Sequence, residues 1–138
     1  MSDWFAVTQE MINQFCDATG DSDWMHVDPE RAKRDGPFGG CVAPGFWSLS
    51  MLPYLVRKTI GEAYPPGALL AINYGFDRIR FTGPVPVGAQ IRLAFKLVDV
   101  GARERGRFLL RSENTIEVEG REQPALIAEW MFLLVYSG

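Results

Sequence analysis

The residues best suited to chemistry lie in one short stretch, TGDSDWMHVDPERA at positions 19–32. This stretch contains the only histidine of the chain, His26, together with nearby carboxylates that include Asp21 and Asp23. A carboxylate close to an imidazole can fix the tautomer of the ring, and the imidazole exchanges protons near neutral pH. Such a pair can remove one proton from water and deliver another. The alternative is structural, with His26 making only a hydrogen bond at a helix end.

Two predicted helices hold this stretch in place. The first covers residues 8–18 and ends at Gly20, the residue type that most often terminates a helix. The second begins with Asp28 as N-cap and Pro29 as the first helical residue, and continues to about residue 34. The segment between the two helices is predicted to be an irregular loop, and it carries the candidate acid–base side chains.

The next helix is predicted to be buried. Residues 35–45 are rich in glycine and proline and are expected to form a loop. Residues 46–60 are apolar on nearly every side, which is typical of a buried helix. Pro53 lies inside this segment and is expected to kink it or to remove a hydrogen bond. Residues 62–68 follow as a predicted linker loop within the same domain.

The second half of the chain has the alternating pattern of β-strands. Apolar and polar residues alternate along 76–81, 91–97 and 108–118, whereas 125–136 is apolar on both faces. Alternation predicts half-buried antiparallel strands, and the last segment reads as a central strand. One buried helix followed by a long antiparallel meander predicts an α+β fold, with the sheet wrapped around that helix.

Length and composition limit the possible functions. The 138 residues predict a single domain over 1–138, and the net charge of −3 gives no support to nucleic-acid binding. Cys16 and Cys41, with a single histidine, make a structural zinc site improbable. Two buried thiols are expected, with a disulfide as the alternative. The chain has no glycine-rich nucleotide-binding loop, so neither a nicotinamide, a flavin nor a nucleoside triphosphate is indicated.

The sequence also lacks the marks of export. The N-terminal segment MSDWFAVTQE has neither the basic nor the apolar region of a signal peptide. The apolar runs are too short or too interrupted to span a bilayer. We therefore expect a cytoplasmic protein without a membrane partner.

The motif GDSDWMH at positions 20–26 resembles the hydratase motif of the (R)-specific enoyl-CoA hydratases, which are MaoC-like dehydratases of the hot-dog fold. The later segments PFGGCVAPGF, NYGFDRIRF, GPVPVG and EGREQPALIAEW resemble the nodulation-protein-N-type branch of this group, so that the resemblance runs from about Phe5 to Leu133. It implies an antiparallel sheet around a long central helix, with Asp21 and His26 as the catalytic pair. It also implies a homodimer, or an assembly of dimers, that binds acyl-CoA in the groove between subunits.

The activity implied is the reversible addition of water to a trans-2-enoyl-CoA, which gives a (3R)-3-hydroxyacyl-CoA. The stereochemistry follows from the resemblance alone. The reaction needs an activated water, a proton for the α-carbon, and a donor to the thioester oxygen, where negative charge develops. Asp21 and His26 would meet the first two needs. The backbone N–H of Gly45, at the start of the buried helix, would meet the third. The alternative for Gly45 is a helix N-cap only. No cofactor is implied, because the coenzyme A thioester is the substrate.

The sequence departs from the family pattern at several positions. Asp23 and Trp24 stand where the family often has Asn and Pro, and Pro44 stands where a His is common. A serine that helps to orient the loop in some hydratases falls on Pro53, while Ser48 and Ser50 lie nearby in a different register. We predict that Asp23 is not catalytic and can be replaced by Asn.

Two further groups of residues have both a functional and a structural interpretation. One group could line an acyl pocket or could simply be core: Phe46, Trp47, Met51 and Tyr54. A second group could bind the phosphates of coenzyme A or could lie on solvated sheet faces: Arg78, Arg80, Arg92, Arg107 and Arg111.

Two other functions compete with hydration. A hot-dog thioesterase would use the same fold, but it would need a carboxylate on or beside the central helix, and residues 46–60 contain neither Asp nor Glu. The other is a non-catalytic acyl-CoA-binding module in which the Asp–His pair is vestigial. Chemistry on the thioester would distinguish an enzyme from this module.

Overall fold

One antiparallel sheet dominates the structure. The computed structural model describes residues 1–61 and 64–137, and within these ranges five strands lie in the order β1-β3-β4-β5-β2. All neighbouring strands are antiparallel, and β1 and β2 form the two edges. The strand bounds are β1 Phe5–Ala6, β2 Ala68–Phe81, β3 Gln90–Arg103, β4 Arg107–Val118 and β5 Leu126–Tyr136.

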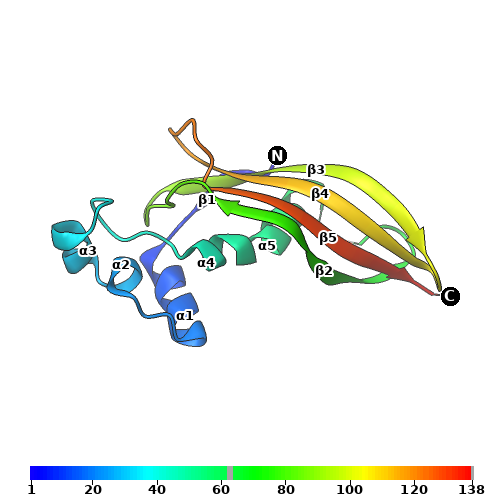
Figure 1. Cartoon of the computed structure of the whole chain (residues 1–138), viewed down its shortest axis with the longest axis horizontal. Helices are drawn as coiled ribbons and strands as arrows, with labels where there is room; N and C mark the ends of the chain where they lie inside the picture. The colour runs from blue at the N-terminus through cyan, green and yellow to red at the C-terminus, as the bar shows by residue number, and fades with distance from the viewer. Residues whose placement is uncertain (62–63, 138) are drawn as a thin grey trace.

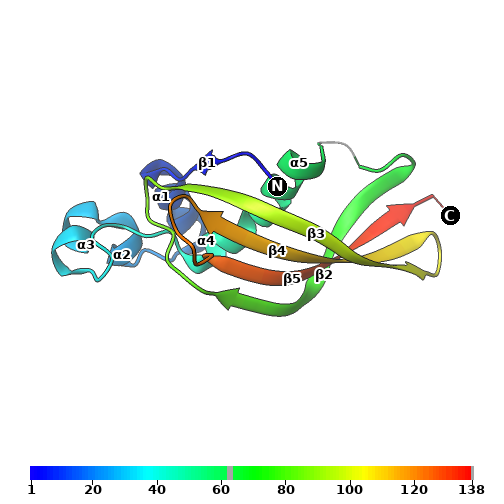
Figure 2. The same ribbon diagram turned by 90° about the horizontal axis from the view of Figure 1, so that it is seen from above.

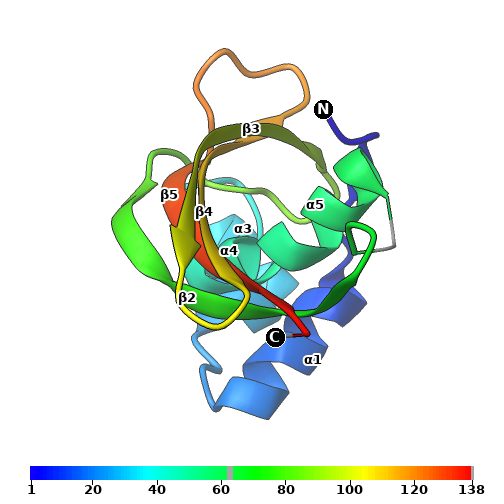
Figure 3. The same cartoon turned by 90° about the vertical axis from the view of Figure 1, so that its right-hand side faces the viewer.

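The sheet curls around two consecutive helices, α4 (Gly45–Ser50) and α5 (Leu52–Ile60), as the end-on view in Figure 3 shows. The other three helices, α1 (Gln9–Thr19), α2 (Trp24–Val27) and α3 (Pro29–Asp35), gather at one end of the sheet (Figures 1 and 2). This arrangement confirms the predicted α+β class and the sheet that wraps around a central helix. No helix in the described ranges is long and apolar enough to cross a membrane.

The core lies between the concave face of the sheet and α5. Its most deeply buried side chains come from the helices and from three of the strands, each at most 1% exposed: Ile12, Leu52, Leu55, Ile91, Leu93, Ile116 and Leu126. Each large aliphatic side chain that leaves water stabilises the fold by about 1.5–3 kcal/mol. Both cysteines are buried and unpaired, as predicted, so the core contains two free thiols and no bridge between them.

The central helix differs from the single kinked helix that the sequence predicts. It is divided at Met51, which ends α4 and also begins α5. Pro53 then lies in the first turn of α5, where the missing N–H has no helical partner to lose. The proline therefore acts as a start signal for a second helix rather than as a kink within one.

The strands begin earlier or end later than the alternating pattern indicates. Strand β2 starts at Ala68, because the apolar run before Phe76 pairs with β5 without strict alternation. Strand β3 continues to Arg103, six residues beyond the alternating segment 91–97. The short edge strand β1 was not predicted. Of the predicted linker 62–68, residues 62 and 63 lie outside the described ranges.

The helix ends follow the sequence signals closely. Thr8 is the N-cap of α1 and accepts a hydrogen bond from the amide of Met11. Gly20 ends this helix in the left-handed region at φ 75°. Asp28 is the N-cap of α3, with Pro29 as its first residue, and accepts a hydrogen bond from the amide of Arg31. Gly20 and Asp28 thus bound the segment that carries Asp21 and His26.

A substitution at Gly20 tests this left-handed stop. An added Cβ would meet no atom within 4 Å, so Gly20→Ala changes backbone strain and not packing. We expect a loss of roughly 1 kcal/mol in the free energy of unfolding, because a residue with a Cβ is strained in this region. Urea denaturation measures it. Gly40→Ala is the control, since this glycine has no positive φ and also has open space around it. Equal stability of the two variants would contradict the assignment.

Candidate active site

The ring of His26 is held by a segment distant in the sequence. His26 lies on α2, is half-buried, and places Nδ1 2.7 Å from the carbonyl oxygen of Val42. A carbonyl oxygen can only accept, so Nδ1 carries the proton and donates it. In the neutral ring Nε2 is then without a proton, and its lone pair can take one from a bound molecule.

Further hydrogen bonds hold both partners of this contact. The amide of Val42 donates to the carbonyl of Met25 at 3.1 Å, next to His26 in the chain. From α1, Gln9 Nε2 donates to the carbonyl of His26 at 2.7 Å. Helix α2 is thus tied to α1 on one side and to the segment before α4 on the other, which fixes the direction of the imidazole.

The structure corrects the expectation that a carboxylate orients this ring. In the part of the chain that the structure describes, no ion pair within 4.0 Å joins His26 to Asp or Glu. Asp21 is exposed in the turn between α1 and α2, and no hydrogen bond of its carboxylate to a described residue is present. The tautomer is set by the carbonyl of Val42 instead. Sequence reasoning missed this residue because every residue carries such a carbonyl.

The charge of Asp21 acts on the end of α1. Burial raises the pKa of the Cys16 thiol, and the negative charges of Asp21 and then Asp17 raise it further. Cys16 lies in the last turns of α1 and belongs to the core. The carboxylate of Asp21 is therefore placed close to this helix end, at the open side of the turn that leads into α2.

Asp23 has a structural role. Its carboxylate accepts a hydrogen bond from the amide of Met25 at 3.0 Å and caps α2, and its carbonyl accepts one from the amide of His26 at 2.9 Å. The predicted irregular loop is therefore wrong for the second half of this stretch, where His26 sits on a short helix. Four residues are too few to show helical periodicity in a sequence.

Gly45 begins α4, three residues after the carbonyl that holds His26. The preceding residue, Pro44, supplies no side-chain cap, and the N–H of Gly45 has no backbone acceptor among the described residues. A Cβ at this position would lie 2.9 Å from the ring of Phe81. Glycine therefore allows the backbone to approach an aromatic side chain closely while its N–H stays available.

A cavity of about 320 Å³ opens beside this glycine, and we call it the Gly45 hollow. Its wall combines the segment before α4, the start of α4, the turn after β2 and the residue before β5. The lining residues are Phe38, Val42, Ala43, Gly45, Ser48, Phe81, Thr82, Gly83, Pro84, Val85 and Ala125. The residue that orients His26 and the residue with the open N–H thus share one cavity.

The residues predicted to line an acyl pocket have a different environment. Trp47 is 4% exposed and belongs to the core, and Met51 and Tyr54 pack against that core. Phe46 is exposed and contacts Phe81 edge-on, with ring centroids 6.0 Å apart. Trp47, Met51 and Tyr54 are therefore part of the core or packed against it.

A second cavity, of about 420 Å³, lies where α4 meets α5. Its wall includes none of the four residues predicted to line an acyl pocket. The lining residues are Leu49, Ser50, Leu52, Pro53, Asn73, Tyr74, Gly75, Phe76 and Trp130.

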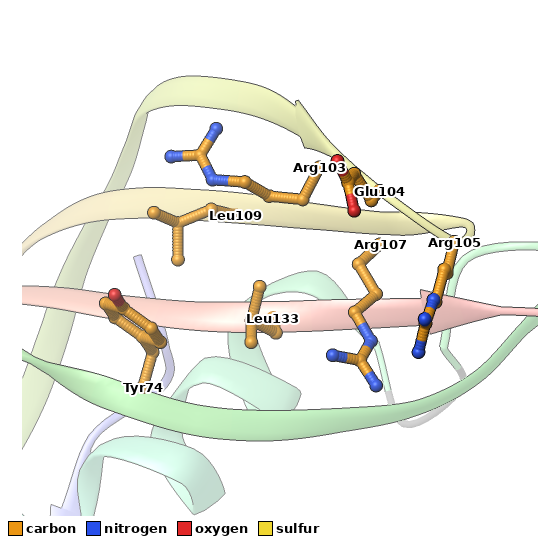
Figure 4. A pocket seen from close by; sticks show the side chains of 7 residues that line it. All are labelled: Tyr74, Arg103, Glu104, Arg105, Arg107, Leu109 and Leu133. Atoms are coloured by element: carbon orange, nitrogen blue, oxygen red, sulfur yellow. The ribbon is translucent and has the colours of Figure 1, made fainter.

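Three of the five strand arginines fall into a paired and a clustered group. Arg92 is bonded to Glu117 and Arg111 to Asp77, so these two lie on charged sheet faces. Arg107 lines a third cavity, at the turn between β3 and β4, that Figure 4 shows from close by: its other lining residues are Tyr74, Arg103, Glu104, Arg105, Leu109 and Leu133. This turn lies at the end of the sheet opposite α1, α2 and α3 (Figure 1). Within one chain, this arginine cluster is remote from His26.

The described residues contain no group of three or more His, Cys, Asp or Glu side chains that could hold a metal ion.

Comparison with known proteins identifies the family of the chain. Residues 1–118 match the family model described as MaoC like domain. The chain belongs to the MaoC-like family. It is 47% identical over 128 residues to 3-hydroxyacyl-thioester dehydratase Z of Mycobacterium tuberculosis (strain ATCC 25618 / H37Rv), which covers 93% of this chain and 82% of that protein. It is 38% identical over 136 residues to Nodulation protein N of Rhizobium meliloti (strain 1021), which covers 99% and 83%.

Solved structures identify the fold of this MaoC-like protein. The R-hydratase PhaJ1 from Pseudomonas aeruginosa superimposes with a TM-score of 0.75 over 98% of this chain and 79% of that one, at 18% sequence identity. The predicted hot-dog fold is confirmed. The predicted enzyme class, a lyase of the hydratase and dehydratase type, is confirmed by the family and by the dehydratase relative.

The capping role of Asp23 makes a specific prediction for this MaoC-like protein. Asn also accepts a hydrogen bond from a helix amide, so Asp23→Asn should keep both stability and turnover. Asp23→Ala removes the acceptor and should cost about 1 kcal/mol of unfolding free energy. Thermal unfolding and an enoyl-CoA hydration assay measure the two properties. An Asp23→Asn variant that folds normally but is inactive would show that this carboxylate takes part in the chemistry.

Proposed function

We propose that the protein catalyses the reversible addition of water to a trans-2-enoyl-CoA to give a (3R)-3-hydroxyacyl-CoA. The observation that supports this proposal most directly is the hydrogen bond from His26 Nδ1 to the carbonyl of Val42, which leaves Nε2 as a base at a fixed position. The name of the dehydratase relative, which refers to a 3-hydroxyacyl thioester, supports the substrate class. The (R) configuration rests on the family resemblance.

The proposed reaction divides the proton transfers between Asp21 and His26. In the hydration direction, His26 Nε2 accepts a proton from water as the oxygen of that water bonds to the β-carbon. The electron pair of the double bond moves towards the thioester oxygen, and the α-carbon then receives a proton through the same pair. Asp21, which is exposed in the turn after α1, would bind and orient the water. One water is added in total, and the enzyme returns to its starting protonation state.

The charge that develops on the thioester oxygen needs a donor in a site with little water. The open N–H of Gly45 can supply it, and the close approach of the backbone to Phe81 leaves an apolar wall beside it. A hydrogen bond to a developing oxyanion is stronger in such surroundings than in water. The thioester would thus lie in the Gly45 hollow, with its β-carbon towards His26.

Replacement of the two proton-transfer residues tests this proposal. His26→Ala and Asp21→Asn should each lower the hydration rate at least about a hundredfold, since general acid–base groups typically contribute that much. Loss of the enoyl-thioester absorbance, with crotonyl-CoA and with a longer enoyl-CoA, measures the rate. Thermal unfolding should show that both variants still fold. Near-wild-type turnover in either variant would refute the pair.

A thiol assay on the same reaction distinguishes the competing functions, because a thioesterase releases a free thiol whereas a hydratase does not. Release of coenzyme A by the wild type, with the double bond intact, would favour the thioesterase. Binding without either reaction would favour the non-catalytic module.

We further propose that the active protein is a homodimer that pairs along the edge of β2. This strand pairs with β5 on one side and with no strand of the described chain on the other. It also carries exposed apolar side chains: Leu69, Leu70, Ile72, Tyr74 and Phe81. An unpaired strand edge with apolar side chains is normally covered, and a two-fold axis covers two such edges at once. Phe81 also lines the Gly45 hollow, so this edge and the site adjoin.

Light scattering tests the assembly. The wild type should be a dimer, and Ile72→Lys should shift it towards the monomer, because a charge then has to be buried at the pairing edge. Turnover should fall in parallel with the dimer fraction on dilution. Val100→Lys is the control, since Val100 is an exposed apolar residue on β3 rather than on this edge. A monodisperse monomer that hydrates enoyl-CoA would contradict the proposal.

A further inference from the structure

The hydroxyl of Ser48 has no hydrogen bond within its helix, in contrast to the hydroxyls of three other helical residues. The hydroxyls of Thr19, Ser50 and Thr59 each donate to the carbonyl four residues earlier, at 2.8, 2.7 and 2.8 Å. Ser48 is only 3% exposed, yet no hydrogen bond of its hydroxyl to a described residue is present. The carbonyl four residues before it, in Pro44, accepts instead from the amides of Trp47 and Ser48. The hydroxyl of Ser48 is therefore free to donate to a molecule from outside the chain.

The hydroxyl of Ser48 is also not sealed inside the protein. Within the described residues, the side-chain polar atoms that are both fully enclosed and unpaired are Asn114 Oδ1 and Trp130 Nε1, and Ser48 is not among them. Ser48 lines the Gly45 hollow, so its hydroxyl is within reach of a molecule bound there.

The position of Ser48 matches the open N–H of Gly45. The two residues are three apart on α4, and residues three apart lie on the same side of a helix. A carbonyl oxygen has two lone pairs and can accept from two donors at once. The nearby wall of the cavity is apolar, with Ala43, Phe81 and Val85, which strengthens a hydrogen bond formed there.

We propose that Ser48 is a further substrate-contacting residue, whose hydroxyl donates a hydrogen bond to the thioester carbonyl oxygen of an enoyl or 3-hydroxyacyl thioester bound in the Gly45 hollow. This inference rests on the proposed function and adds a second donor to it. Ser48 forms no covalent bond in this role. It stabilises the negative charge that the oxygen carries after water has added to the β-carbon. This charge leaves the oxygen when the α-carbon is protonated.

Variants at Ser48 separate the donor from the shape of the side chain. Ser48→Ala removes the hydroxyl, Ser48→Cys keeps nearly the same volume with a much weaker donor, and Ser48→Thr restores a hydroxyl. We expect kcat for crotonyl-CoA hydration to fall at least about tenfold in the Ala and Cys variants, because a donor to a developing oxyanion acts mainly in the transition state. KM should change less than kcat, and the Thr variant should recover part of the loss. Ser50→Ala is the matched control on the same helix, and it should stay within about twofold of the wild type.

A vibrational measurement tests the contact without turnover. Crotonyl-CoA labelled with ¹³C at the thioester carbonyl is bound to His26→Ala and to the double variant His26→Ala/Ser48→Ala, and the carbonyl stretch is recorded by difference infrared spectroscopy. Loss of a donor to the oxygen should raise the stretching frequency in the double variant. A purely structural role of Ser48 would leave the frequency unchanged.

The outcomes distinguish this inference from the proposed function. A wild type that hydrates crotonyl-CoA, with unchanged kcat and carbonyl frequency when Ser48 becomes Ala, would overturn the role of Ser48 alone. An equal loss in the Ser48→Ala and Ser50→Ala variants, accompanied by a lower melting temperature, would overturn it as well. A wild type that hydrates neither crotonyl-CoA nor a longer enoyl-CoA would overturn the proposed function and this inference together.

Discussion

The site depends on one hydrogen bond, from His26 Nδ1 to the carbonyl of Val42. It joins a four-residue helix, too short to be stable alone, to the segment that leads into the central helix. The amide of the same Val42 returns a hydrogen bond to Met25, so the two segments hold each other at two points. Because the acceptor is a main-chain carbonyl, the neutral ring is held in a single tautomer without the help of a second ionisable group.

The helix boundaries could be predicted where a single residue sets the boundary by its own side chain or backbone conformation. Gly20 acts through its backbone freedom and Asp28 through its side chain, and each ends or begins a helix as predicted. Strand alternation also predicted which face of β4 is buried, including the polar Ser112 and Asn114 on that face. Their hydrogen bonds to each other and to backbone carbonyls of β5 explain why polar side chains are accommodated there.

The rest depends on contacts between segments, which no local pattern records. Helix α2 consists of four residues and starts at a carboxylate whose capping bond appears only in three dimensions. The beginning of β2 is apolar without alternation, and only its pairing with β5 makes it a strand. The candidate site was predicted as a set of residues, Asp21, His26 and Gly45. The Gly45 hollow could not be predicted, because its wall requires Phe81 and Val85 from outside that stretch.

The strand order affects when the parts of this site come together during folding. Strands β3, β4 and β5 follow one another both in the chain and in the sheet, so they can form as successive hairpins with short loops. Strand β2 precedes them but pairs with the last of them, which requires closure of a much longer loop. Until β2 docks, Phe81 is absent from beside Gly45 and the cavity has no wall on that side. We therefore expect the Gly45 hollow to be complete only after β2 has docked, later than the hairpins of β3, β4 and β5.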